Sequence, residues 1–201
     1  MKNTFLVPEQ RTPHFYLPSH KLSWKQDLSS LKQEFSKEDL AEFLTFYSLA
    51  EESPKKAQKK VEKFREKYPN SPAVLNLLTF LYLSRRKIFK ANRLIRENYA
   101  NNPHDLFARI NYADLCLRKK KSEAIGEVFN HTYSLTELYP ERKTFHVSEF
   151  RGFMVVMGFY HLAIGKKEAA ECYHYLAAKV DPDHPGPKVL AKKLFFKLKK
   201  G

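Results

Sequence analysis

Apolar residues along most of this chain recur at intervals of three and four, the spacing of one face of an α-helix. Trp24, Leu28, Leu31 and Phe35 follow Ser23 in this way, so a helix is expected to begin at Ser23. Other helix starts are marked by a capping hydroxyl ahead of an acidic residue or a proline. These signals are Ser36 with Asp39, Ser53 with Pro54, and Ser71 with Pro72. Further helices are expected at about 88–101, 105–118, 123–138, 148–164, 167–180 and 187–199, and no segment shows the alternation typical of a strand.

The first 21 residues follow a different pattern. Pro8, Pro13 and Pro18 stand five residues apart, which excludes a regular helix. Aromatic and aliphatic residues, among them Phe5 and Phe15, lie between the prolines. The pattern predicts an extended N-terminal tail over residues 1–21. We expect this tail to be docked, because burying its apolar side chains offsets the entropy lost on ordering them.

Small residues and prolines repeat along the chain. Ala57 and Pro69 are followed 34 residues later by Ala91 and Pro103. A period of 34 residues is that of the tetratricopeptide repeat (TPR). The stretch 151–183 matches further, at small packing residues, a turn glycine and a closing Asp-Pro pair: Gly158, Gly165, Ala170, Ala177, Asp181 and Pro182. The chain therefore resembles the tetratricopeptide repeat family, with divergent repeats.

The resemblance implies an all-α fold: a right-handed α-α superhelix, or TPR-like solenoid, of about four helix pairs between an N-terminal helix and a C-terminal capping helix. The pairs are expected at about 38–71, 72–104, 105–140 and 148–184, and the capping helix at 187–199, all within one helical domain over residues 22–201. Pro140 comes 37 residues after Pro103, so the third pair is expected to have a longer second helix.

Composition narrows the function. The chain has 201 residues, of which 43% are hydrophobic, as is typical of a folded domain with its own core. Its six glycines form no phosphate-binding loop and no catalytic set can be proposed, so we expect neither an enzyme nor a cofactor. His161, His174 and Cys172 lack metal-ligand spacing, so packing and not metal binding is their expected role. Cys116 and Cys172 suggest buried thiols, and with no leader or apolar span the sequence predicts a cytoplasmic protein.

The formal net charge of +14 points to an acidic partner. In a stack of helix pairs, the turns inside the pairs share one edge, and basic residues recur in these turns. They form a predicted basic edge: Arg85, Arg86, Lys87, Arg118, Lys119, Lys120, Lys121, Lys166 and Lys167, preceded by Lys55 and Lys56. The alternative is that these side chains are merely solvated and favour the helix dipole.

Members of the resembled family usually bind a peptide on the concave surface formed by the first helices. Projected onto this sequence, that surface gives an apolar groove: Asn76, Phe80, Leu83, Phe107, Ile110, Asn111, Asp114 and Phe159. No groove lysine accompanies Asn76 and Asn111, so capture of a C-terminal carboxylate is disfavoured. A partner segment or the N-terminal tail could fill such a groove. Alternatively, these residues are core between helix pairs and no groove exists.

The preferred interpretation is a non-enzymatic scaffold or adaptor that binds another protein, with an apolar or acidic segment, through the concave face and the basic edge. The alternative is an RNA- or phosphate-binding module that uses the basic edge and the basic C-terminal helix around 192–200. Against nucleic acid, the spacing of Phe89 from Leu94 and Ile95 suggests core, which leaves the edge without a stacking ring. The identity of the partner and the oligomeric state stay open.

Overall fold

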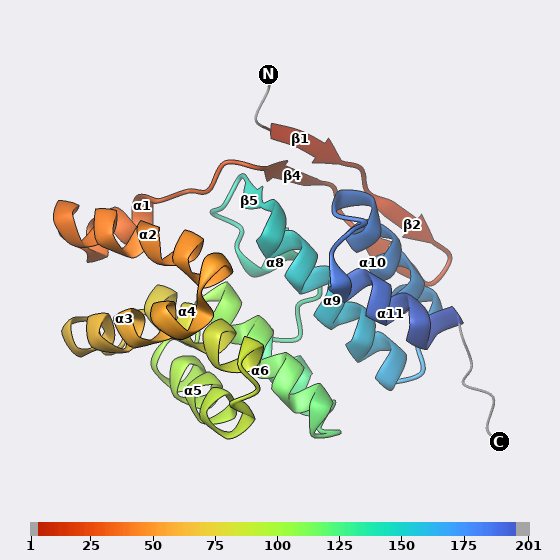
Figure 1. The fold of residues 1–201 in the computed structure, drawn as a ribbon. Helices are drawn as coiled ribbons and strands as arrows, with labels where there is room; N and C mark the ends of the chain where they lie inside the picture. Colours follow the sequence, from red (N-terminus) through yellow and green to blue (C-terminus); the bar gives the residue numbers. More distant parts are fainter. Residues whose placement is uncertain (1–3, 196–201) are drawn as a thin grey trace. The chain divides into compact units, whose positions relative to one another are not determined.

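A computed structural model describes residues 4–195 of the chain. Within this range the protein is mostly helical, with eleven helices and five short strands (Figure 1). The chain divides into two compact units. A helical unit covers Asp27–Leu115, and the second unit is built from the residues up to Gln26 and from Cys116 onwards. Helix α6 (Leu106–Arg118) begins in the helical unit and ends in the second one.

The helical unit begins with α1 (Ser29–Glu34). Two helix pairs follow, α2 (Lys37–Glu52) with α3 (Pro54–Lys67), and α4 (Pro72–Ser84) with α5 (Ile88–Asn101). From α1 to α5, each helix packs against the next along the chain. Two serine caps act as predicted, since Ser36 Oγ accepts the N–H of Asp39 at 3.1 Å and Ser71 Oγ accepts that of Val74 at 3.4 Å.

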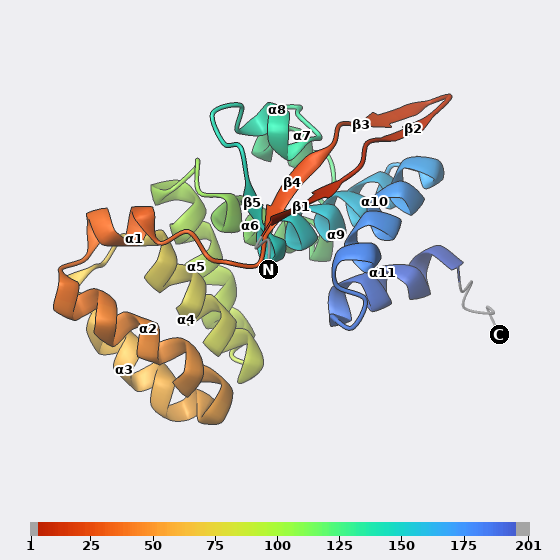
Figure 2. The same ribbon diagram turned by 90° about the horizontal axis from the view of Figure 1, so that it is seen from above.

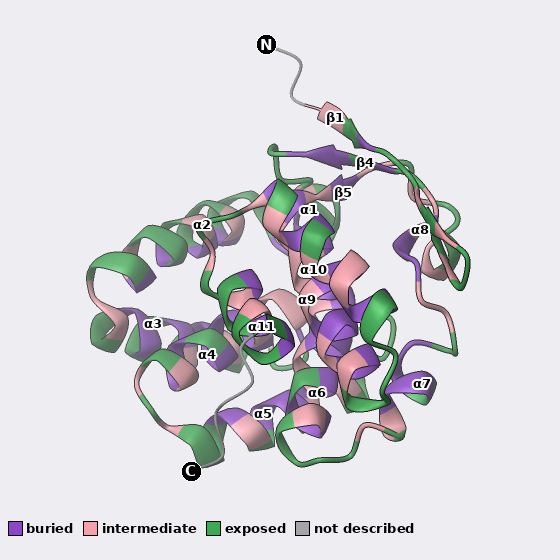
Figure 3. Cartoon of the chain, turned by 90° about the vertical axis from the view of Figure 1, so that its right-hand side faces the viewer, coloured by how far each residue is buried: buried purple, intermediate pink, exposed green. Residues whose placement is uncertain are grey.

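Aromatic rings fill the core of the helical unit. Phe43 and Phe46 of α2 are fully buried against Phe64 of α3, with ring centroids 5.7 and 5.4 Å from that of Phe64. Ala57 and Ala91, the alanines that repeat with the 34-residue period, are fully buried in the same core. Figure 3 shows the resulting one-sided burial, with buried and exposed patches alternating along α2 and α3.

The second unit combines short strands with helices. Strand β1 (Thr4–Val7) is antiparallel to β4 (His20–Ser23), and β4 pairs in parallel with β5 (Phe145–His146). Between β1 and β4, β2 (Gln10–Thr12) and β3 (Phe15–Leu17) form a separate antiparallel pair. The helices are α7 (Ala124–Val128), α8 (Leu135–Leu138), α9 (Val147–Ala163), α10 (Lys167–Val180) and α11 (Pro185–Phe195).

The N-terminal tail is part of the core of the second unit. Val7, Leu17 and Leu22 are at most 2% exposed. The ring of Phe15 lies edge-on to that of Tyr173 of α10, with centroids 5.2 Å apart. Figure 2 shows these strands running beside α9 and α10. The tail is therefore docked, as its apolar residues suggest, and it is organised as strands.

Three expectations about secondary structure are wrong. The chain is mostly helical, which is consistent with an all-α fold, but the expectation that it has no strands is wrong, because short strands form within residues 4–23 and at 145–146. The first helix begins at Ser29 and not at Ser23, since Ser23 ends β4. The helix expected at 123–138 is broken into α7 and α8, and is therefore interrupted and not lengthened. Asn130 and His131 adopt φ angles of 52° and 54° there, a left-handed conformation that ends a helix.

The fold at the C-terminal end follows the prediction as far as the described residues reach. Helix α11 carries Leu190 and Leu194 on its buried side and lysines on its exposed side. The remainder of the capping helix expected at 187–199, and of the basic segment around 192–200, lies outside the described residues. The superhelix and the number of repeats stay predictions.

Candidate binding surface

Positive charge in the helical unit gathers on the second helix of each pair. Together, α3 and α5 carry ten Lys and Arg residues and three Glu residues. Nine of these cations are exposed and form what we call the basic face: Lys55, Lys56, Lys59, Lys60, Lys63, Lys67, Lys90, Arg93 and Arg96. The first helix α2 has the opposite balance, with five acidic residues and one lysine. In the pair of α2 and α3 the two helices therefore carry opposite charge, whereas α4 has no charged residue beside the basic α5.

Two ion pairs tie α3 to its neighbours. Lys67 donates to the carboxylate of Asp39 in α2, and the hydroxyl of Tyr68 donates to the same oxygen at 2.6 Å. These two donors hold the pKa of the Asp39 carboxyl below its usual range. Arg65, the half-buried cation of α3, pairs with Glu97 of α5. The carboxylates of α3 and α5 are too few to match the remaining lysines and arginines, so the basic face keeps a net positive charge.

A shallow pocket of about 230 Å³ lies between α3, α4 and α5. It is lined by Arg65, Tyr82, Lys90, Arg93, Leu94 and Glu97. The hydroxyl of Tyr82 donates to Glu62 Oε1 at 2.9 Å, and burial together with this acceptor raises the pKa of Tyr82 to about 12. The phenol is therefore neutral near pH 7, and the lining holds three cations against one carboxylate. This balance of charge favours an anion.

The turn between α4 and α5 is held against α3 by a buried glutamine. Gln58 is 4% exposed, and its Oε1 accepts hydrogen bonds from the guanidinium of Arg85 and, at 3.0 Å, from Lys87 Nζ. Its Nε2 donates to Glu62 at 2.6 Å. Two of the three basic-edge residues in this turn are thus engaged in the fold, while Arg86 is exposed.

Three turns of the predicted basic edge share one backbone geometry. In each turn, a residue with positive φ donates its N–H to the carbonyl three residues earlier, and the next residue donates to the carbonyl five residues earlier, as in a Schellman motif. The positive-φ residues are Arg86, Lys120 and Gly165, with φ of 56°, 57° and 80°. The residue that follows is a lysine each time: Lys87, Lys121 and Lys166. The flanking residues of the edge are exposed: Arg118, Lys119 and Lys167.

The expectation that Phe89 belongs to the core is wrong. Its side chain is 93% exposed, and the neighbouring Ile88 is 43% exposed. The buried side of α5 carries Ala91, Leu94 and Ile95. At about 100° per residue, Phe89 lies about 200° around the helix from Ala91, which directs its ring to solvent. An aromatic ring therefore stands at the turn where Arg86, Lys87 and Lys90 also lie.

The predicted groove is only partly available. The side-chain amides of Asn76 and Asn111 bond to each other at 3.0 Å, and Asn76 also bonds to Asn98 at 2.9 Å and to Asp105 at 3.1 Å. These two groove residues therefore serve the packing of α4, α5 and α6. The other members differ in exposure: Phe80 and Asp114 are exposed, Leu83, Phe107 and Phe159 are half-buried, and Ile110 is buried.

Phe159 lies in the second unit, whereas the other groove residues lie in the helical unit. It packs beside a buried cluster of Ala170, Leu190 and Leu194. Lys193 Nζ lies 5.4 Å from the centroid of its ring. This contact with α11 gives Phe159 a packing role within its own unit.

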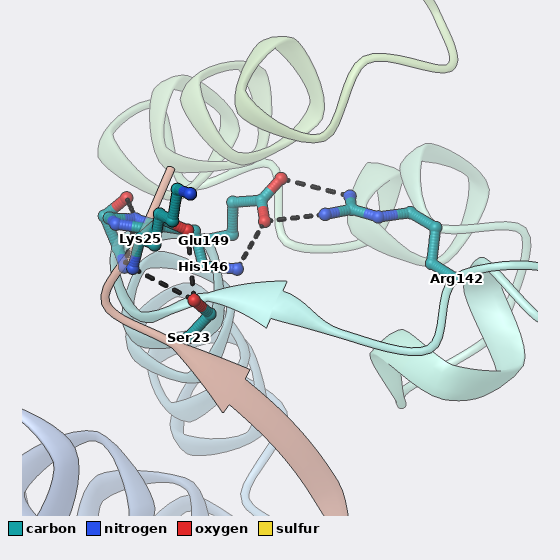
Figure 4. A network of polar contacts seen from close by, with 6 residues as sticks. Ser23, Lys25, Arg142, His146 and Glu149 are labelled. Atoms are coloured by element: carbon teal, nitrogen blue, oxygen red, sulfur yellow. Dashed lines mark hydrogen bonds and ion pairs between the residues drawn. The ribbon is translucent and has the colours of Figure 1, made fainter. Parts of the chain in front are cut away.

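A polar network in the second unit joins the strands to the start of α9 (Figure 4). Glu149 accepts two hydrogen bonds from the guanidinium of Arg142, at 2.7 and 3.0 Å, and one from the backbone N–H of His146 at 2.8 Å. The imidazole Nε2 of His146 lies 3.1 Å from the carbonyl oxygen of Trp24. Because these groups bond to one another, the network has the role of holding β5 and α9 to the N-terminal segment.

The histidines of α9 and α10 pack against aromatic rings. His161 is 5% exposed and stacks on Tyr173 with ring centroids 5.1 Å apart, and neither of its nitrogens has a hydrogen-bond partner. Burial lowers the pKa of His161 to about 4. His174 lies against Phe195, at 5.4 Å. In residues 4–195, no three His, Cys, Asp or Glu side chains gather as a set of metal ligands.

No protein-family model matches the sequence, and a comparison with curated proteins finds no match either. The resemblance to tetratricopeptide repeats therefore rests on the residues of this chain alone. No helix within the described range is both long enough and apolar enough to cross a membrane.

The sequence reasoning did not identify the pocket. Arg65, Tyr82 and Arg93 come from three different helices, so their proximity follows from tertiary packing. A signal for the basic face was nevertheless present, because seven of the fourteen residues of α3 are Lys or Arg. These lysines and arginines lie along α3, the second helix of its pair, and not only in the turns of the predicted basic edge.

Proposed function

We propose that this protein is a non-enzymatic, TPR-like binding protein whose helical unit holds a polyanionic partner on the basic face of α3 and α5. The observation that carries the proposal is the excess of ten cations over three carboxylates on these two helices. A surface of one charge raises the local concentration of an oppositely charged partner and speeds its association. The pocket lined by Arg65, Lys90 and Arg93 adds a concave point at which an anionic group can be surrounded.

The pairing of the carboxylates supports a binding role over a catalytic one. Glu62 accepts hydrogen bonds from Tyr82 and Gln58, and Glu97 is paired with Arg65. A general base must have a lone pair directed at a substrate proton. Glu62 and Glu97 are instead committed to neighbouring side chains.

A charge-reversal experiment tests the proposal. The variant combines Lys60→Glu, Lys63→Glu and Arg93→Glu on the basic face, and the matched control combines Lys21→Glu, Lys143→Glu and Lys192→Glu at exposed positions of the second unit. Binding to labelled heparin, oligouridylate and polyglutamate is measured by anisotropy over a range of salt concentrations. We expect the basic-face variant to weaken binding at least about tenfold and to flatten its salt dependence.

The control should change binding much less, although it removes the same formal charge. Equal losses in the two variants would show that net charge alone, and not the basic face, attracts polyanions. Absence of binding to all three probes at low salt would overturn the proposal.

A second candidate function is the binding of a protein segment on the first helices, as the groove interpretation suggests. The observation that favours it is the exposure of two aromatic rings there, Tyr47 of α2 at 39% and Phe80 of α4 at 53%. Affinity capture with nuclease-treated lysate, comparing the wild type with Phe80→Ala, tests this function. A protein partner that is retained by the wild type and lost with Phe80→Ala would support it, and equal recovery would exclude a role for Phe80.

A further inference from the structure

We propose that the polyanion is a single-stranded nucleic acid, and that Phe89 is a stacking platform for one of its bases. The inference rests on the proposed function and names its ligand. Phe89 is 93% exposed, so its ring is available to a planar partner. Single-strand binding proteins combine such rings with cations that follow the phosphate backbone.

The cations needed for this mode lie along the same helix. Phe89, Arg93 and Arg96 are spaced by four and three residues, so they share one face of α5, and all three are exposed. At a rise of 1.5 Å per residue, this row is about 10 Å long. A base stacked on Phe89 would therefore place its backbone beside two guanidinium groups.

The charge of the pocket suits a phosphate group. Lys90 and Arg93 line it together with Arg65, and its volume is about 230 Å³. A phosphodiester group is small and anionic, and the excess of positive charge in the pocket favours it.

The turn before Phe89 is held in place before any ligand arrives. Arg85 and Lys87 are both hydrogen-bonded to the buried Gln58. Lys87 also stands at the N-cap position of α5, where its backbone carbonyl accepts the N–H of Ala91 at 3.0 Å. A rigid backbone reduces the entropy lost when a base is captured. The backbone that carries Phe89 is therefore held in place next to the pocket.

A single strand fits this arrangement better than a duplex or an acidic peptide. In a duplex the base faces are covered by neighbouring bases, so Phe89 would find no π-surface to stack on. An acidic peptide could use the cations but offers no base to the ring. Oligouridylate, the corresponding duplex and polyglutamate therefore serve as three probes that separate these ligands.

The test uses the full chain and the variant Phe89→Ala. Stacking on an aromatic side chain contributes an amount that corresponds to a factor of about 5 to 150 in affinity, so we expect a loss of that size for oligouridylate. The salt dependence should be unchanged, because the phosphate contacts remain. Phe89→Trp should keep or strengthen binding, and its added indole fluorescence should be quenched by the oligonucleotide.

Tyr175→Ala is the matched control, because Tyr175 of α10 is also an exposed aromatic residue and belongs to neither proposed binding surface. It should leave the affinity for oligouridylate unchanged. Thermal unfolding of both variants should match the wild type, since neither ring is buried. A loss of binding can then be attributed to position 89.

The outcomes separate this inference from the proposed function. Salt-dependent binding that is equal for all three probes and insensitive to Phe89→Ala would overturn the stacking platform while keeping a polyanion-binding face. Preference for polyglutamate would identify an acidic protein as the ligand and also overturn the inference. Failure of every probe to bind at low salt would overturn the proposed function itself.

Discussion

Arg86 and Lys120 hold a left-handed backbone conformation that residues with a Cβ atom adopt at a cost. Their φ angles are 56° and 57°, and the equivalent turn position further along the chain is Gly165, with φ of 80°. The left-handed region costs about 1–2 kcal/mol per residue for most L-residues, and glycine avoids this penalty. Two turns therefore keep a basic side chain at a position that favours glycine.

Replacing Lys120 with glycine should stabilise the protein. We expect Lys120→Gly to raise the free energy of unfolding by about 0.5–1 kcal/mol, because the relief of backbone strain exceeds the added entropy of the unfolded chain. Gly165→Ala should lower it by about 1 kcal/mol through the backbone alone, since no atom lies within 4 Å of the added Cβ position. Urea unfolding measures both. A stabilising Gly165→Ala would contradict the assigned turn geometry.

Two buried histidines should make the second unit sensitive to acid. His20 is 1% exposed and His161 is 5% exposed, and burial lowers the pKa of each to about 4. An unperturbed histidine has a pKa of 6.5, whereas these two histidines have a pKa of about 4 in the folded protein. Between pH 6.5 and about 4, the unfolded chain therefore binds protons that the folded chain does not.

The free energy of unfolding should therefore fall as pH drops through this window, by about 1.4 kcal/mol per pH unit for each histidine, and should be insensitive to these groups above it. Urea titrations of the wild type and of His161→Phe provide the measurement. His161→Phe should lose a share of the pH dependence. Parallel pH profiles for wild type and His161→Phe would argue against the lowered pKa.

At the scale of elements, the contact between α9 and α11 depends on the absence of a side chain. A Cβ added at Gly158 would lie 2.4 Å from Leu190 Cδ2, which is too close for two carbon atoms. The repeat pattern assigned Gly158 to the packing of the last helix pair. In the structure, it provides the space into which Leu190 of α11 inserts.

Gly158→Ala should still destabilise the protein, because moving the buried Leu190 costs about 1–3 kcal/mol and the gain of about 1 kcal/mol in helix propensity offsets only part of this cost. Leu190→Ala alone should cost about 2–5 kcal/mol through the cavity it leaves. The double variant, Gly158→Ala with Leu190→Ala, should lose less free energy of unfolding than the two single variants lose together. A double-mutant cycle in urea would detect this difference. Val189→Ala, at an exposed neighbour, should change stability by less than about 0.5 kcal/mol. Strict additivity would show that the two residues do not touch.

The helices were predictable from the sequence because their signals are local. Ser36 and Ser71 accept the capping bonds expected of them, and α4 begins at the expected Pro72. Helices α5, α9 and α10 begin and end within about two residues of their expected ranges. The strands were not predictable, because two to four residues are too few to show an alternation. The pairing of Leu22 with Phe145 also has no signature in either segment.

The candidate site was predictable only in its composition. Lysines in the turns and in α3 are visible in the sequence, but the proximity of Arg65, Tyr82 and Arg93 is a tertiary property. Phe89 was misassigned because spacing alone does not fix which side of a short apolar run faces the core. The hydrogen bond between Asn76 and Asn111 has no signature in the sequence either, because it depends on how α4 and α6 pack.

At the scale of the whole molecule, 36 basic residues against 22 acidic ones imply self-repulsion in the folded state. Moderate NaCl should therefore raise the unfolding temperature, since added ions screen this repulsion. A gain of about 1 kcal/mol in the free energy of unfolding would raise the unfolding temperature by about 2–4 °C for a chain of this size. The variant with Lys21→Glu, Lys143→Glu and Lys192→Glu should gain less from salt. Scanning calorimetry at low and moderate NaCl measures the difference, and no response in either protein would contradict the repulsion.

The parallel pairing of β4 with β5 also sets an order of events during synthesis. Leu22 of β4 lies opposite Phe145 of β5, so β4 can pair with β5 only after roughly 120 further residues have been synthesised. At typical ribosomal rates, this synthesis takes about 6–25 s. All of residues 27–115 are made within that interval, and a two-stranded β1 and β4 hairpin is marginal by itself. Ribosome-bound chains stalled before Phe145 should therefore be cut rapidly by trypsin at Lys21, and chains released after completion should resist. The helical unit is therefore expected to fold before β4 can pair with β5.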